Sequence, residues 1–276
     1  MIKNEKLKWI NILIWIASIF VMIGIMMYGP RVADDENSSM VIESAALTII
    51  MFIFLYIISG KKTFTFLNNK TIYTIKGLAP MLIFPGIFFV FGVFEVLFEN
   101  PELISNWKSN VLFGALNMFF VGMYEETCFR ACACDALLPV LKKIKHPFFF
   151  TALISSFVFG YVHVTETDFS SFIQTLQFVL KLVTTALNGA MLMFAYWKTR
   201  NIFALGIIHG LNDLLPYFFF FIFNFPYASD SASYTDGSVG TTVVYFIQLI
   251  FEILVFRYVY KKFLKDLDFK KTLEEW

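Results

Sequence analysis

The sequence has few charged residues, few histidines and few cysteines. Charged residues make up 16% of the 276 positions, against about 25% in an average soluble domain, whereas hydrophobic residues make up 58%. So much apolar surface excludes both a single water-soluble domain and a disordered chain. The three cysteines lie between Cys128 and Cys134 and make no disulfide framework, and a net charge of +1 gives no case for a nucleic-acid partner. We therefore predict an all-α, polytopic membrane protein.

Long uncharged runs predict eight transmembrane helices in a single membrane domain, residues 1–276. A helix needs about 20 apolar residues to cross the hydrocarbon core of a bilayer. Such runs cover about residues 9–28, 41–59, 77–98, 110–138, 147–164, 172–197, 202–223 and 241–260. The first run is longer than the core of a typical signal peptide and has no obvious cleavage site, so we expect a retained helix.

Lysine and arginine are confined to alternate loops. Of the 22 such residues, 18 lie in the N-terminus, in the loops 60–76 and 139–146, in the turn 198–200 and in the tail from residue 257. The opposite loops hold only Arg31 and Lys108, beside ten acidic residues. Because cytoplasmic loops collect Lys and Arg, we expect both termini in the cytoplasm.

Ionisable residues inside the predicted helices are the candidate functional residues, because a charge at membrane depth costs ~3 kcal/mol or more. They are Glu43, Glu125, Glu126, Arg130, Asp135, His163, Lys181, His209, Asp213 and Glu252. Glu43, Asp135 and Glu252 lie within about two turns of a predicted helix end, so we expect them to reach headgroups or water. Lys181 lies nearer the middle of its helix and receives no role.

The predicted helix 110–138 carries two adjacent glutamates and one arginine. Glu126 and Arg130 are four residues apart and share a helix face, so we predict that they pair. Glu125 points elsewhere and lacks this partner. The pattern suggests that Glu126 is neutralised structurally, whereas Glu125 is left free for chemistry.

Two of the three histidines lie at membrane depth on separate helices. His163 follows Phe159 by four residues, and His209 precedes Asp213 by four, a spacing at which a carboxylate can orient an imidazole. A lone buried histidine is more often a satisfied core residue, but two of them with an unpaired glutamate favour a site. Such a set supports activation of water by Glu125 as general base.

In this set His163 and His209 either stabilise an oxyanion or bind a divalent metal such as zinc, together with Glu125 or Asp213. The paired-histidine signature of soluble metalloproteases is absent, and a metal-free mechanism stays open. The helical rise puts Glu125 and His163 about 25 Å from the basic ends of their helices, but His209 only about 12 Å. Tilt, or a deeper start of the helix 147–164, is needed to bring them together.

These motifs, in this order, resemble the CPBP family, which is named after CAAX prenyl proteases and bacteriocin-processing proteins and is also called Abi. Its pattern of Glu-Glu-x-x-x-Arg, Phe-x-x-x-His and His-x-x-x-Asn/Asp matches Glu125, Glu126 and Arg130, then Phe159 and His163, then His209 and Asp213. The resemblance covers about residues 110–223 and implies an intramembrane endopeptidase similar to type II CAAX prenyl endopeptidases. It implies catalytic roles for Glu125, His163, His209 and Asp213, and structural roles for Glu126, Arg130 and Phe159.

The resemblance implies a peptide or a lipid-anchored protein as substrate, from bacteriocin or pheromone maturation or with a CAAX-like tail. Short loops favour the bacterial branch and hence the plasma membrane. One alternative is a non-enzymatic scaffold or immunity protein that regulates a partner in the membrane, but the Glu and His residues argue for an enzyme. Another is a transporter with a Glu/His proton relay, which would often show repeated halves; we find none.

Overall fold

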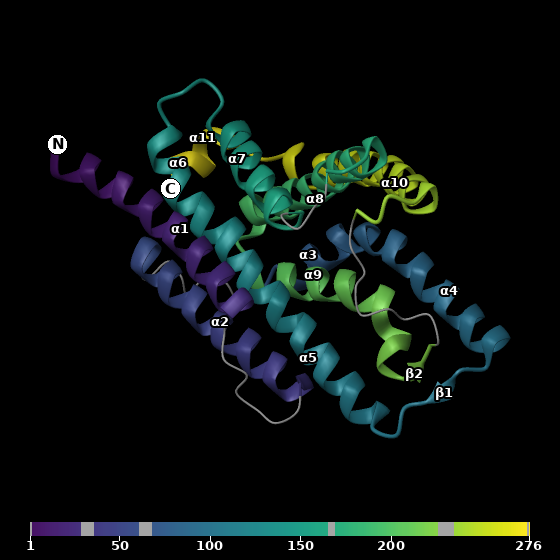
Figure 1. Cartoon of the computed structure of the whole chain (residues 1–276). Coiled ribbons are helices and arrows are strands. Elements are labelled where there is room, and N and C mark those ends of the chain that lie inside the picture. Colours follow the sequence, from purple (N-terminus) through teal and green to yellow (C-terminus); the bar gives the residue numbers. More distant parts are fainter. Residues whose placement is uncertain (1, 29–35, 61–67, 165–168, 226–234, 275) are drawn as a thin grey trace.

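The computed structural model describes residues 2–28, 36–60, 68–164, 169–225, 235–274 and 276, and nearly all of them are helical (Figure 1). The helices are α1 (Ile2–Tyr28), α2 (Glu36–Ser59), α3 (Thr71–Leu78), α4 (Ile83–Glu99), α5 (Trp107–Glu126), α6 (Ala133–Leu141), α7 (Pro147–Val162), α8 (Phe172–Thr199), α9 (Ile202–Tyr217), α10 (Val239–Leu264) and α11 (Phe269–Glu274). In this part of the chain the one sheet pairs β1 (Glu102–Leu103) with β2 (Phe223–Asn224), antiparallel. The all-α prediction is confirmed.

Six helical stretches are long and apolar enough to cross a membrane, which makes the chain an integral, polytopic membrane protein. They are Lys8–Tyr28, Asn37–Ser59, Thr71–Glu99, Phe172–Thr199, Ile202–Phe221 and Val239–Leu264. The two other predicted spans correspond to α5 with α6 and to α7. Helix α7 has only 16 residues, and α5 with α6 places polar side chains such as Asn117 and Asp135 inside the protein. The count of eight crossings therefore stays a prediction.

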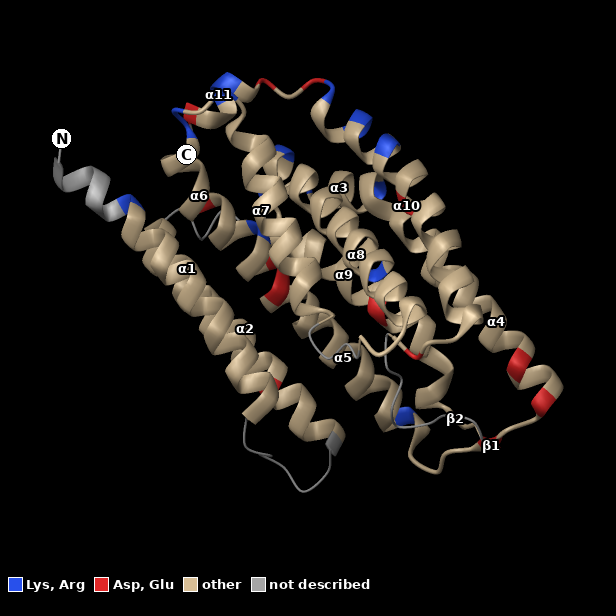
Figure 2. Ribbon diagram, turned by 45° about the horizontal axis from the view of Figure 1, so that its top comes forward, with Lys and Arg blue, Asp and Glu red and all other residues tan. Residues whose placement is uncertain are grey.

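The basic loops meet at one end of the bundle. The Lys70 ammonium donates to the Lys198 carbonyl at 3.3 Å, and the Lys198 ammonium donates to the Asp266 carbonyl at 3.0 Å. Figure 2 shows Lys and Arg gathered at this end, near α11 and the end of α10. At the opposite end, Asn37 donates to Asn110 at 3.0 Å, near the start of α5. The predicted loop positions of Arg31, Lys61, Lys62 and several acids lie outside the described residues.

Between α5 and α6, residues Thr127–Cys132 form a buried π-helical segment, which the hydrophobic pattern over 110–138 did not predict. A π turn is one residue wider than an α turn and is frequent at functional sites. Its carbonyls find partners on neighbouring helices: the Trp15 indole donates to the Cys128 carbonyl at 3.1 Å, and the Ser155 hydroxyl donates to the Phe129 carbonyl.

Helices α5 and α9 approach each other backbone to backbone. A Cβ atom added to Gly122 would collide with the Gly206 carbonyl and the Gly210 nitrogen of α9. Glycines four residues apart, as in 206 and 210, let membrane helices pack this closely. The crossing brings the end of α5, with its two glutamates, against the middle of α9.

Two acids expected to reach water are instead inside the protein, which corrects the expectation for Asp135 and Glu252. Asp135 is buried and accepts hydrogen bonds from the Ser59 hydroxyl and the Trp276 indole. Glu252 lies in the middle of α10, and its carboxylate accepts from the Asn188 amide at 2.6 Å. Protein partners replace water at both positions, because the neighbouring helices offer polar hydrogens.

Candidate active site

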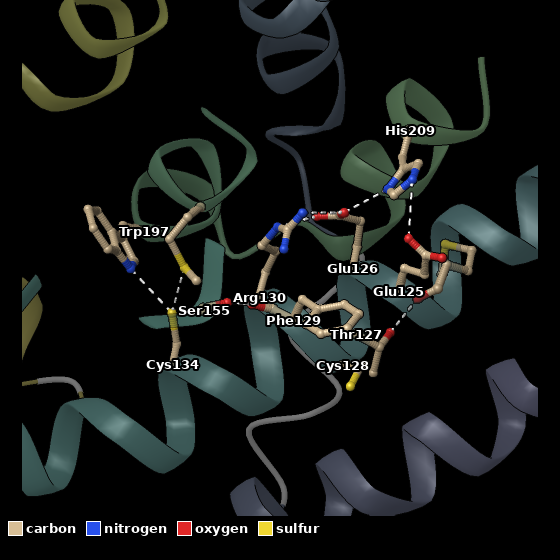
Figure 3. Close-up of polar contacts among 12 residues, drawn as sticks. Glu125, Glu126, Thr127, Cys128, Phe129, Arg130, Cys134, Ser155, Trp197 and His209 are labelled. Carbon is tan, nitrogen blue, oxygen red and sulfur yellow. Dashed lines mark hydrogen bonds and ion pairs between the residues drawn. The ribbon is translucent and has the colours of Figure 1, made fainter. Parts of the chain in front are cut away.

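The seven residues singled out in the sequence come together from α5, the π-helical segment after it, α7 and α9. Glu125 and Glu126 end α5, and Arg130 follows in the π-helical segment. Phe159 lies in α7 and His163 is its C-cap, whereas His209 and Asp213 lie in α9. Figure 3 shows Glu126 between Arg130 and His209, with Glu125 on the other side of the His209 ring.

Glu126 and Arg130 form the fully buried base of the site. Arg130 Nε lies 3.0 Å from Glu126 Oε2, Arg130 Nη2 donates to Oε1 at 3.1 Å, and both side chains are 0% exposed. The guanidinium carbon lies 4.3 Å from the centre of the Phe159 ring. Within the described residues Arg130 Nη1 has no hydrogen-bond partner, and the ring face supplies a cation–π contact instead.

His209 links the two glutamates. Its Nδ1 lies 2.8 Å from Glu126 Oε1, and its Nε2 lies 3.4 Å from both Glu125 Oε2 and Asp213 Oδ2. A carboxylate can only accept, so Nδ1 carries a proton that it donates to Glu126. The carboxylate that orients the ring is therefore Glu126, from another helix, whereas the spacing had suggested Asp213.

His163 also lies close to Glu125. Its Nδ1 donates to the Phe159 carbonyl at 2.6 Å, and its Nε2 lies 3.6 Å from Glu125 Oε2. The two Nε2 atoms thus converge on one carboxylate oxygen. That oxygen is buried and has no hydrogen-bond partner among the residues that the structure describes.

Exposure rises from the base of the site to its rim. The Glu125 and His209 side chains are 7% and 8% exposed, whereas those of His163 and Asp213 are 26% and 32% exposed. The site therefore opens on the side of His163 and Asp213. These contacts also place Glu125, His163 and His209 at one level, although simple helix lengths had put them at different depths.

The donor types at the site suit zinc, which takes imidazole nitrogens and carboxylate oxygens. Among the described residues, however, no group of three or more His, Cys, Asp or Glu side chains is arranged to hold a metal ion. The arrangement as it stands does not fit a ligand shell, and we derive no step through a metal. Zinc binding by His163 and His209 remains a prediction for metal analysis to decide.

Comparison with known proteins agrees with this cluster. Residues 106–215 match the family model for type II CAAX prenyl endopeptidase Rce1-like proteins. This part of the chain is similar to Rce1-like proteins. It contains all seven cluster residues, confirms the resemblance found in the sequence and implies a protease. The searches of curated proteins and of solved structures each find no match.

The sequence motifs did not predict three features that support the candidate site: the π-helical segment, the hydrogen bonds to its carbonyls and the close crossing of α5 and α9. The π-helical segment left no signal in the hydrophobic pattern. Trp15 and Ser155, which bind its carbonyls, looked like ordinary helix residues. The close crossing of α5 and α9 does have a signal in the sequence, because Gly206 and Gly210 are four residues apart and lie beside His209.

Proposed function

We propose that the protein is an intramembrane endopeptidase in which Glu125 activates the attacking water. The observation that carries the proposal is the convergence of His163 Nε2 and His209 Nε2 on Glu125 Oε2, at 3.6 and 3.4 Å. A buried carboxylate oxygen without a hydrogen-bond partner among the described residues is an acceptor ready for a water proton. The arginine-bound Glu126 is unsuited to this role, since Arg130 and His209 engage its oxygens.

The steps follow from these positions. Glu125 takes a proton from water as the oxygen attacks the peptide carbonyl, whose π electrons move onto its oxygen. The resulting oxyanion needs donors, and the Nε2 atoms of His163 and His209 lie nearest to Glu125. When the tetrahedral intermediate collapses, the C–N bond breaks and Glu125 returns the proton to the leaving amine.

The Nε2 atoms can donate only when the rings are doubly protonated, because each Nδ1 already holds a proton for Phe159 or Glu126. Around His209, the carboxylates of Glu125, Glu126 and Asp213 are opposed by the guanidinium of Arg130 and, at Asp213, by the ammonium of Lys181. A proton on His209 Nε2 would face two of these carboxylates, each at 3.4 Å.

The membrane setting of the proposal follows from the loops. Eight crossings with both termini in the cytoplasm, in a bacterial plasma membrane, agree with the gathering of Lys and Arg at one end (Figure 2). The substrate would be a peptide or a lipidated tail that reaches the rim at His163 and Asp213. A metal is not required by these steps.

Cleavage by the purified full-length chain in proteoliposomes tests the proposal, with a fluorescence-quenched farnesylated CAAX peptide as the probe. Glu125→Gln keeps the shape of the side chain but removes the base, so cleavage should fall by about 10²–10⁴-fold. Glu99→Gln, at the exposed end of α4, is the matched control and should cleave like the wild type. Equal cleavage by Glu125→Gln and wild type would refute the general base.

A further inference from the structure

A groove between α7, α8 and α10 lies apart from the active site. Its volume is about 750 Å³, and its walls are almost entirely apolar, with Phe157 of α7, Ala190 of α8 and Phe256 of α10 among the lining residues. On α7, the rim residues Phe149, Leu153 and Phe157 are 61%, 52% and 53% exposed. A groove of this kind on a membrane helix opens toward the lipid and has room for a hydrocarbon chain.

The mouth of the groove is basic. Lys145 and His146 line it, and they end the loop 142–146, which also holds Lys142 and Lys143 and contains no acidic residue. On the far side of the mouth, Phe269 begins α11, and its acidic neighbour Asp268 accepts a hydrogen bond from the Lys271 backbone at 3.0 Å. One end of an otherwise apolar groove thus carries the positive charge.

The mouth also coincides with the start of α7. His146 is the N-cap residue of this helix and makes no side-chain cap hydrogen bond. Pro147 opens the helix and has no N–H, so the first-turn donors are the N–H groups of Phe148 and Phe149, which together with the helix dipole favour a negatively charged group. A phosphate at this point would meet both these groups and the Lys145 ammonium.

We infer that the groove binds an anionic phospholipid, with the phosphate at Lys145 and His146 and one acyl chain along α7 and α8. The division into an apolar trough and a basic mouth matches the two parts of such a lipid, and basic pockets between helices on the cytoplasmic side bind anionic headgroups. The lipid would join α7 to α10 across the groove. Since α7 also carries Phe159 and His163, the lipid would steady one wall of the active site.

Binding to the detergent-solubilised full chain tests this inference, with dioleoyl phosphatidylglycerol and dioleoyl phosphatidylcholine as the probes. The readouts are lipid retained in native mass spectrometry and the shift in melting temperature. Phosphatidylglycerol should be retained and should raise the melting temperature more than phosphatidylcholine. Lys145→Gln should bind phosphatidylglycerol about fivefold more weakly, the factor expected for one basic residue beside an anionic headgroup.

Two matched pairs of variants separate the groove from general effects of charge and bulk. Lys108→Gln removes a base from the opposite end of the bundle and should bind the lipid normally. Ala190→Phe fills the groove and should lose the lipid, whereas Ala17→Phe adds the same side chain at an exposed position of α1 and should keep it. The exposed Lys145 variant keeps the test valid if Ala190→Phe does not fold.

Equal binding of the two phospholipids by the wild type, or retention of phosphatidylglycerol by Ala190→Phe, would overturn the inference. So would displacement of the lipid by the farnesylated peptide in Glu125→Gln, because the groove would then hold the lipid tail of a substrate. These outcomes are independent of the proposed function, since neither lipid retention nor melting temperature requires cleavage.

Discussion

Two polar clusters buried among the described helices differ in how their charges are matched. In the cluster of α5, α7 and α9, Glu125, Glu126 and Asp213 surround His209, and Arg130 pairs with Glu126. In the cluster of α8 and α10, one carboxylate, that of Glu252, accepts hydrogen bonds from the Asn188 and Gln248 amides at 2.6 and 3.4 Å.

The difference separates a reactive arrangement from a structural one. Neutral amides that donate hydrogen bonds to a carboxylate satisfy its acceptors, so no substrate or water is needed as a partner. In the first cluster, by contrast, one oxygen of Glu125 has no hydrogen-bond partner among the described residues, and two imidazoles face it. Several carboxylates around one imidazole, and an open acceptor at a site reached from the surface, are expected of catalysis.

The largest expected effect is on cleavage, and it should appear in the first cluster alone. His209→Ala and His163→Ala should each lower the cleavage rate by about 10²–10⁴-fold, because each removes a proposed hydrogen-bond donor to the oxyanion. Combining either change with Glu125→Gln should cost little more, since residues that act as a unit are not additive. Rates in proteoliposomes measure both statements.

Gln248→Ala is the counterpart in the second cluster. It leaves Glu252 with the shorter of its two amide contacts, so cleavage should stay close to that of the wild type. A large loss in Gln248→Ala would show that the second cluster also serves catalysis, and the comparison would fail.

The next effect is on stability and distinguishes the adjacent glutamates. Arg130→Ala leaves Glu126 buried with an uncompensated charge, and Glu126→Ala does the same to Arg130. Each substitution should lower the free energy of unfolding by about 3–5 kcal/mol. Glu125→Ala breaks no such pair and should unfold near the wild type. Unfolding in detergent measures all three. If Glu125→Ala is the least stable and Glu126→Ala unfolds like the wild type, the roles of the two glutamates are reversed.

Local patterns in the sequence predicted much of this arrangement. The apolar runs gave the helices to within a few residues, and the spacing of Glu126 and Arg130 predicted their ion pair, now seen at 3.0 Å. Contacts between distant residues were beyond such patterns. The hydrogen bond from His209 to Glu126 depends on how α5 crosses α9; the spacing of Gly206 and Gly210 indicates a close crossing but does not specify α5 as the partner helix.

A smaller effect should follow from altering this crossing. A Cβ added by Gly210→Ala would lie 2.6 Å from the Met118 carbonyl oxygen of α5, so the helices must separate. Overpacking of this kind costs about 1–3 kcal/mol, and the displacement of His209 should lower cleavage as well. Gly86→Ala in α4 is the control, because a Cβ there meets nothing within 4 Å. Equal stability of the two variants would argue against a tight crossing.

The smallest effect concerns the π-helical segment, which only the first cluster has, since Glu252 lies within a continuous α-helix. Trp15 is 3% exposed, and its indole donates to the Cys128 carbonyl of that segment at 3.1 Å. Trp15→Phe keeps an aromatic ring but removes the donor, which should cost about 1 kcal/mol, the usual net worth of one hydrogen bond.

The segment begins directly after Glu126 and contains Arg130, so loosening it should also lower cleavage, although far less than His209→Ala does. Trp9→Phe makes the same change at a position of α1 that is 60% exposed. This variant should have the stability and the cleavage rate of the wild type. If Trp15→Phe loses stability but cleaves like the wild type, the π turn is a packing feature of α5 and α6. A loss of both would tie the irregular backbone to the geometry of the reactive cluster.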